Sequence, residues 1–195
     1  MSDQNGTGAE MDRIAVARRA CLLILAVVGW SAVLLQLGLV VREVTAEGGS
    51  PLVGLVDTFS YFTVLTNTLV AAVATASLWG GRGGLLARPA AQAATAVYIF
   101  VVGLIYSLML RTLWAPTGLQ KAADVMLHDL TPLLYTAYWL VLASKDGLRW
   151  PHAGWWLGYP AAYIAYSFGY GAVTGRYLYP FTDLPKLSFL AVMPG

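Results

Sequence analysis

An apolar stretch of the chain, residues 122–143, carries polar side chains that recur at helical spacing. At about 100° per residue, one face of a helix there presents Asp124, His128, Thr131, Tyr135 and Tyr138. A carboxylate one turn before an imidazole can fix its tautomer, and the imidazole can then act as a general base. His128 is therefore our first candidate for chemistry, with Asp124 orienting its ring. The alternative is a structural histidine that bonds a neighbouring helix.

A second apolar stretch contributes a candidate nucleophile. Thr63 lies six residues after Asp57, and His128 lies seven residues after Lys121. If both stretches are helices that begin on one side of the same apolar layer, the two side chains lie at one depth, about 10 Å in. A hydroxyl needs an adjacent base to become a nucleophile, and His128 would supply it. Taken alone, Thr63 is more typical of a packing residue whose hydroxyl bonds the carbonyl of Phe59.

Three further polar side chains belong to the same end of these helices. Asn67, one turn after Thr63, could donate an amide hydrogen to an oxyanion, or it could hold two helices together. Arg111 could hold a substrate carboxylate, or its charge could contact lipid headgroups. Asp129 lies about 100° around the helix from His128, so we expect it to face a different neighbour.

The composition indicates what kind of protein positions these groups. Of the 195 residues, 58% are hydrophobic and 11% are charged, whereas soluble domains have about 25% charged residues. An ordinary soluble domain and a disordered chain are therefore excluded. A net charge of +2 without a basic cluster argues against nucleic acid as a partner. Two histidines and one cysteine are too few for the usual zinc site, so we expect neither a metal nor a cofactor.

Uncharged runs indicate where the chain crosses a membrane. We expect spans at about residues 20–41, 58–79, 89–110, 122–143 and 153–173. A helix of 22 residues reaches roughly 33 Å, enough for a hydrocarbon core of about 30 Å. The last run, residues 187–195, is too short to cross and would be an interfacial stub or part of a sixth helix. The sequence predicts an all-α integral membrane protein, a polytopic bundle of five full transmembrane helices plus a possible truncated sixth. A polar tail, residues 1–19, would precede one transmembrane domain, residues 20–195.

Charges in the loops predict the orientation of the bundle. The N-terminal tail and the loops after the second and fourth spans hold seven Lys and Arg residues, and the opposite side holds five. Because cytoplasmic loops are enriched in Lys and Arg, we expect the N-terminus in the cytoplasm.

Polar faces recur on three of the expected spans. The span at residues 153–173 has one face formed by Tyr159, Tyr163, Tyr166 and Tyr170. Exposure of such polar faces to lipid is unfavourable, so we expect them to turn inward around a shared cavity.

Three short motifs together resemble a known family. They are FSYFTVLTN at residues 59–67, LHDLTPL at residues 127–133 and YLYPF at residues 177–181. Their order, spacing and membrane placement resemble the bacterial Pr6Pr membrane proteins and, more distantly, the androgen-induced membrane proteins of animals. The resemblance runs from the first span through the loop after the fifth.

This resemblance implies a specific activity. In the animal relatives, a threonine nucleophile and a histidine base in membrane helices hydrolyse fatty acid esters of hydroxy fatty acids. The matching positions are Thr63 and His128. On the residue-level reasoning above, Asp124 and Asn67 would support this pair. We expect Arg111 and Tyr179 to bind the substrate. The implied setting is a bacterial cell membrane, with membrane lipids and a lipid or small amphipathic molecule as partners.

Two non-enzymatic functions remain open on the residues themselves. The first is a carrier or receptor for a small amphipathic ligand, in which Asp124, His128 and Asp129 form a proton-linked gate. The second is a membrane assembly factor whose polar faces dock a partner span. The sequence shows no internal repeat and no pair of interrupted spans, which are common signs of a transporter.

Overall fold

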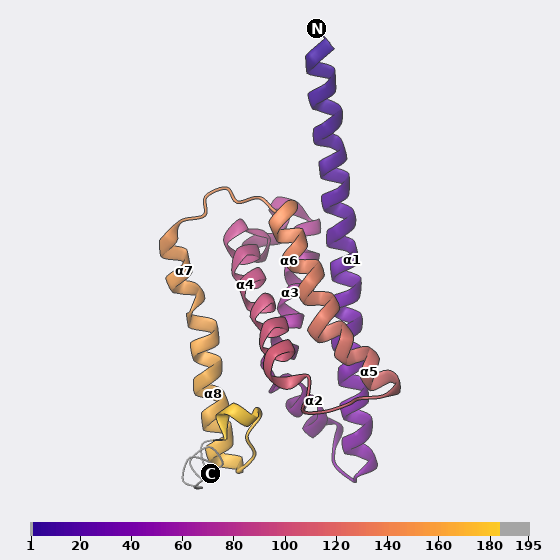
Figure 1. Ribbon diagram of the computed structural model, residues 1–195, viewed down its shortest axis with the longest axis vertical. Helices are drawn as coiled ribbons and strands as arrows, with labels where there is room; N and C mark the ends of the chain where they lie inside the picture. The colour runs from indigo at the N-terminus through magenta and orange to yellow at the C-terminus, as the bar shows by residue number, and fades with distance from the viewer. Residues whose placement is uncertain (1, 184–195) are drawn as a thin grey trace. The chain divides into compact units, whose positions relative to one another are not determined.

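The computed structural model describes residues 2–183, and these residues form helices and connecting loops with no β-strand (Figure 1). The chain divides into two compact units, Met1–Arg149 and Trp150–Gly195, which are described separately below. The stub or partial sixth helix expected at residues 187–195 lies outside the described residues.

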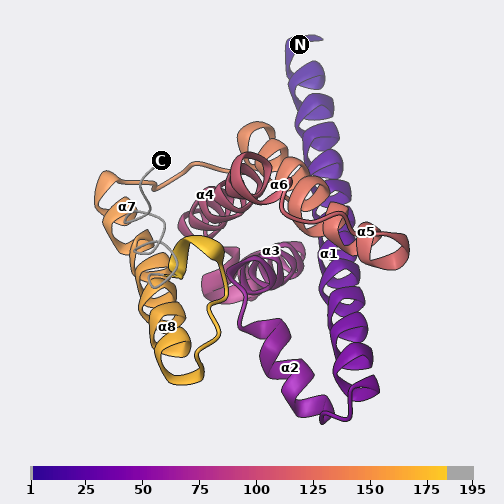
Figure 2. The same ribbon diagram turned by 60° about the horizontal axis from the view of Figure 1, so that its bottom comes forward.

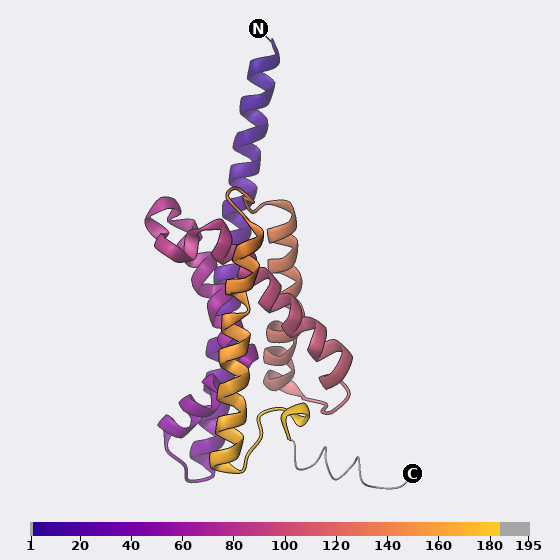
Figure 3. The same cartoon turned by 90° about the vertical axis from the view of Figure 1, so that its left-hand side faces the viewer.

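The first unit contains the longest apolar helices. Its α-helices are α1 (Ser2–Ala46), α2 (Pro51–Phe59), α3 (Phe62–Leu78), α4 (Pro89–Ile105), α5 (Gly118–Val125) and α6 (Thr131–Val141). A 3-10 segment, η1 (Gly80–Ala87), precedes α4, and two π-turns, η2 (Tyr106–Leu110) and η3 (Met126–Leu130), interrupt α-helical geometry. Residues 2–19, expected as a polar tail, continue α1 as helix, which projects beyond its neighbours (Figure 3).

Two helices of this unit are long and apolar enough to cross a membrane, Glu10–Ala46 and Pro89–Leu110. A third crossing is possible if α2 and α3 are counted as one bent span, because together they pass the same test with an 82° bend between them. The protein is thus an all-helical integral membrane protein. The bend between α2 and α3 is visible in Figure 2.

Local sequence explains the corner between α1 and α2. Gly48 adopts φ 85°, a conformation that glycine takes at little cost and that commonly ends helices. Ser50 then caps α2 by accepting a hydrogen bond from the Val53 amide, and Pro51 occupies the first turn, where its missing N–H is harmless. The chain therefore reverses direction within a few residues.

Small residues let the helices of the first unit approach closely. A Cβ at Gly29 of α1 would lie 3.0 Å from the Cβ of Ala71 on α3. A Cβ at Gly103 of α4 would lie 2.9 Å from the Cβ of Pro132 on α6 and 3.3 Å from the carbonyl oxygen of His128. In membranes, where lipid is as apolar as the side chains, close backbone approach of this kind favours helix association.

Away from the candidate site, a buried glutamine holds α4 against α6. The Tyr138 hydroxyl donates to Gln92 Oε1 at 2.9 Å, and the Tyr135 hydroxyl donates to the Gln92 carbonyl at 3.3 Å. The Gln92 side-chain amide donates in turn to the Ala87 carbonyl at 2.8 Å. Two tyrosines of the expected polar stripe thus face the interior, but their hydroxyls serve helix packing.

The second unit consists of α7 (Trp150–Trp156), α8 (Gly158–Thr174) and the short η4 (Pro180–Thr182). Tyrosine rings follow one another along α8: the centroid of Tyr166 lies 6.0 Å from that of Tyr163 and 5.9 Å from that of Tyr170. Gly175, at φ 71°, ends α8. The chain then folds back, so that the Tyr177 ring lies where a Cβ on Gly171 would be.

The Gly103 contact predicts a large effect from one methyl group. Gly103→Ala would force α4 and α6 apart and should lower the free energy of unfolding by about 1–3 kcal/mol. Gly38→Ala in α1 is the matched control, because no atom lies within 4 Å of its added Cβ. Thermal unfolding in detergent, followed by circular dichroism, checks the difference. Equal midpoints for the two variants would contradict the packing described here.

Candidate functional site

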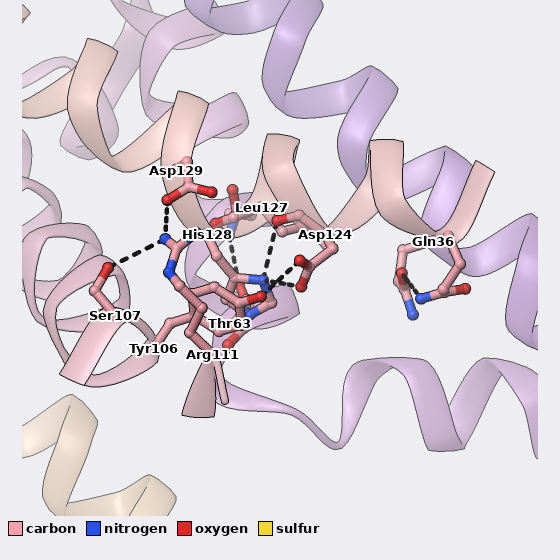
Figure 4. A network of polar contacts seen from close by, with 11 residues as sticks. Gln36, Thr63, Tyr106, Ser107, Arg111, Asp124, Leu127, His128 and Asp129 are labelled. Atoms are coloured by element: carbon pink, nitrogen blue, oxygen red, sulfur yellow. Dashed lines mark hydrogen bonds and ion pairs between the residues drawn. The ribbon is translucent and has the colours of Figure 1, made fainter. Parts of the chain in front are cut away.

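The centre of the candidate site is a buried pair, Asp124 and His128, on the continuous run of α5, η3 and α6 (Figure 4). His128 Nδ1 lies 3.0 Å from Asp124 Oδ1 and 3.1 Å from the Asp124 carbonyl oxygen. The side chains are 15% and 2% exposed for His128 and Asp124, respectively. The carboxylate and the imidazole are thus in direct contact, out of bulk solvent.

The neighbours of His128 determine which ring nitrogen carries the proton. Both oxygens next to Nδ1 belong to Asp124 and are acceptors, so Nδ1 is the donor in the neutral ring. No hydrogen bond to Nε2 is found among residues 2–183. The free lone pair on Nε2 is what a general base requires.

Tyr106 completes the group from a different helix. Its hydroxyl donates to Asp124 Oδ2 at 2.6 Å, and its ring stacks on the His128 imidazole with centroids 3.9 Å apart and planes at 14°. Sequence reasoning missed this residue, one of eleven tyrosines. Its position along the expected span could have indicated it. Tyr106 lies five residues before Arg111, which places it near the same end of the helix bundle as His128.

A π-turn carries each of the two stacked rings. In η3, which holds His128, the Thr131 amide bonds the Met126 carbonyl; in η2, the Arg111 amide bonds the Tyr106 carbonyl at 2.8 Å. The sequence predicts a break near His128, because Pro132 has no N–H to donate. The structure meets this constraint by widening the turn. Such π-turns are often found at functional sites.

Asn67 joins α3 to the His128 segment. Its side-chain amide donates to the Thr63 carbonyl at 2.9 Å and to the Leu127 carbonyl at 3.1 Å. Both amide hydrogens are therefore used, which favours the helix-linking role over donation to an oxyanion. The Asn67 oxygen Oδ1 is buried and has no hydrogen-bond partner in the described part of the chain.

Thr63 stands at the beginning of α3, next to the bend. It is the second residue of the helix and is buried, with 9% of its surface exposed. Because the chain bends at residues 60 and 61, the expected bond from its hydroxyl to the Phe59 carbonyl is not formed. Within residues 2–183, this hydroxyl has no hydrogen bond to any group, including the His128 ring. Asn67 nevertheless ties the Thr63 main chain to Leu127, the residue before His128.

Arg111 and Asp129 form an ion pair at the edge of the site. Arg111 also donates to the Ser107 hydroxyl at 3.3 Å, and its guanidinium lies 4.9 Å from the centroid of the Tyr106 ring. The hydrogen bond to the Asp129 carboxylate raises the pKa of Arg111 above its ordinary value, so the side chain stays charged. Arg111, Tyr106 and His128 thus form a stack of a cation on two rings.

Tyr179 belongs to the second unit. Its ring stacks on Phe181 at a centroid distance of 5.1 Å and meets Tyr163 edge-on at 6.4 Å. The role in substrate binding expected for Tyr179 stays a prediction. In the described part of the chain, no three His, Cys, Asp or Glu side chains converge where a metal ion could bind.

The Asn67 link predicts a loss of stability when it is removed. Asn67→Ala removes two buried hydrogen bonds, one of them between helices, and should lower the free energy of unfolding by about 1–3 kcal/mol. Thr68→Val is the control, because within residues 2–183 the Thr68 hydroxyl bonds the Val64 carbonyl of its own helix and no other group. Unfolding midpoints in detergent measure both. An unfolding midpoint of Asn67→Ala equal to that of Thr68→Val would refute the stabilising role of this link.

Comparison of the chain with models of protein families, with curated proteins and with solved structures finds no match.

Proposed function

We propose that the protein is an intramembrane hydrolase of lipid carboxylic esters, of the class in which a fatty acid is esterified to a hydroxy fatty acid. The observation that carries this proposal is the Asp124–His128 pair, in which the carbonyl and carboxylate oxygens of Asp124 lie 3.1 Å and 3.0 Å from Nδ1 and Nε2 has no hydrogen bond within the described residues. Ionisable side chains inside a membrane protein are costly and therefore rare, and those that are present commonly serve a function.

Thr63 is the proposed nucleophile. Its oxygen attacks the ester carbonyl carbon while His128 Nε2 takes the hydroxyl proton. The resulting tetrahedral intermediate expels the alcohol, which receives that proton from His128, and leaves an acyl group on Thr63. A water molecule, deprotonated by the same nitrogen, attacks this second ester. The fatty acid is released and Thr63 regains its proton.

Hydrogen-bond donors for the oxyanion come from the start of α3. The first N–H groups of a helix have no partner within it, and no side chain caps this helix. The positive end of the helix dipole also favours a negative charge there. Because Asn67 already uses both amide hydrogens, we assign the oxyanion to the backbone amides of Thr63 and Val64.

Arg111 is the proposed partner for the free carboxylate of the substrate. Its described contacts to Asp129 and Ser107 both use Nη2, and a guanidinium has five N–H donors. With 45% of its side chain exposed, Arg111 has donors left for an acid headgroup. A bipolar lipid would then place its acid at Arg111 and its ester deeper in the bundle.

We further propose that the chain crosses a bacterial cell membrane five times, with its N-terminus in the cytoplasm, and that it is a Pr6Pr protein. Support comes from the uncharged runs, the distribution of Lys and Arg, and the three motifs. The bent α2–α3 segment would then supply the second crossing.

A carrier for a small amphipathic molecule is the second candidate. One observation favours it: the break between α2 and α3, because transporters often build their binding sites at interrupted membrane helices. Such a carrier needs no nucleophile. Ligand binding that survives Thr63→Ala, without hydrolysis by the wild type, would support it.

Hydrolysis by the purified protein in lipid vesicles tests the main proposal. With a fatty acid ester of a hydroxy fatty acid as substrate, Thr63→Ala and His128→Ala should each lower kcat by about 10⁴-fold or more, because nucleophile and base act as a unit. Thr63→Ser keeps the hydroxyl and should stay within about tenfold of the wild type. Wild-type turnover that persists in Thr63→Ala would eliminate threonine as the nucleophile.

Cysteine labelling tests the proposed topology. In a Cys21→Ser background, a membrane-impermeant maleimide should label Ser50→Cys and Thr117→Cys in intact cells. Asp12→Cys and Ser144→Cys should react only after the membrane is permeabilised, since an odd number of crossings separates the two sets. Labelling of Ser144→Cys in intact cells would overturn the proposed arrangement.

A further inference from the structure

We propose that Tyr106 is a positioning residue of this site, which holds both Asp124 and the His128 ring in the geometry needed for base catalysis. The inference rests on the proposed function for its catalytic consequence. Its structural basis is independent: Tyr106 is 3% exposed, donates to Asp124 Oδ2 at 2.6 Å and stacks on His128. Among the side chains of residues 2–183, Tyr106 is the one that both donates a hydrogen bond to Asp124 and stacks on His128.

The hydrogen bond from Tyr106 keeps the carboxylate in its useful form. Asp124 presents one oxygen to each partner, Oδ1 to His128 and Oδ2 to Tyr106. Among the described residues, the Tyr106 hydroxyl gives this carboxylate its hydrogen bond, whereas Oδ1 lies at ion-pair distance from His128 and the hydrogen bond of Nδ1 goes to the Asp124 carbonyl. A buried carboxylate that loses its donor is expensive to keep ionised. Once protonated, Asp124 would donate to Nδ1 and the ring proton would move to Nε2. His128 would then have no lone pair directed away from Asp124, and its function as a base would be lost.

The stacking contact fixes the plane of the imidazole. A hydrogen bond at Nδ1 alone allows the ring to swing about that contact, whereas a parallel ring at 3.9 Å limits the swing. The guanidinium of Arg111 covers Tyr106 at 4.9 Å and adds a cation–π attraction that holds the phenol in place. Tyr106 thus acts on His128 by two separate contacts, a shared carboxylate and a shared ring face.

Tyr106→Phe separates these two contacts, because it keeps the ring and removes the donor. The chain has two histidines, so ¹⁵N-histidine labelling gives two imidazoles, and a His152→Gln sample assigns them. In the wild type we expect the neutral His128 ring to carry its proton on Nδ1. In Tyr106→Phe we expect the Nε2–H tautomer to appear, and kcat for ester hydrolysis to fall by about tenfold or more at an unchanged KM.

Tyr135→Phe is the matched control. Tyr135 is also a buried tyrosine that donates one hydrogen bond, but its acceptor is the Gln92 carbonyl. We expect this variant to keep the wild-type His128 tautomer and kcat. A loss of kcat in both variants, with the tautomer unchanged in both, would show a general packing effect and overturn the positioning role.

The two readouts distinguish failure of this inference from failure of the proposed function. If the wild type hydrolyses no ester, the proposed function fails, while the tautomer in Tyr106→Phe still decides whether Tyr106 positions His128. An unchanged tautomer in Tyr106→Phe overturns the inference even if hydrolysis is observed. If Tyr106→Phe does not fold, the tautomer of His128 in the wild-type protein is the test. A neutral wild-type ring with its proton on Nε2 would contradict the proposed contact of Nδ1 with Asp124.

Discussion

The carboxylate of Asp124 is the constraint on which the rest of the first unit depends. It is 2% exposed in an all-helical membrane protein, where an unpaired charge is very costly. Oδ1 lies 3.0 Å from Nδ1 of His128, one turn further along the chain, and Oδ2 accepts a hydrogen bond from Tyr106 of η2, which continues α4. Helix α4 must therefore pack at the correct depth beside α5 and α6. Both π-turns lie at this contact, where each adjusts the direction of one ring.

Two local features make this arrangement possible. The first is the pairing of Gly103 with Pro132, which brings α4 against α6 beside the His128 carbonyl. The second is the bend between α2 and α3, which places Thr63 in the first turn of a helix. In the proposed function, this hydroxyl would be the nucleophile and His128 the base. Asn67 ties the Thr63 main chain to Leu127, the residue before His128.

Much of the site could be predicted from the sequence because it follows helical periodicity. Four of the five stripe residues, Asp124, Thr131, Tyr135 and Tyr138, are buried, and the Asp124–His128 contact is the one expected from one-turn spacing. Equal depth of Thr63 and His128 in the membrane stays a prediction, and the Asn67 bridge ties the Thr63 main chain to the residue before His128. The likeness to the Pr6Pr proteins stays a prediction, as does the five-span count.

Other features could not be predicted, for physical reasons. The bend at residues 60 and 61 contains neither proline nor glycine. The hydroxyls of Thr58 and Ser60 bond the carbonyls of Gly54 and Val56 one turn back, a contact that slightly destabilises a helix but also occurs inside unbroken α3 and α4. Tyr106 was missed because its contacts cross between helices, and because a π-turn shifts the phase that a regular helix would give.

Reaction with a fluorophosphonate probe, followed by mass spectrometry of the modified peptide, tests the central claim most directly. Such a probe reacts with a hydroxyl that a neighbouring base has activated. The account predicts a covalent adduct on Thr63 in the wild type and no adduct in His128→Ala. An adduct on a different residue, or no adduct on protein shown to be folded, would contradict it.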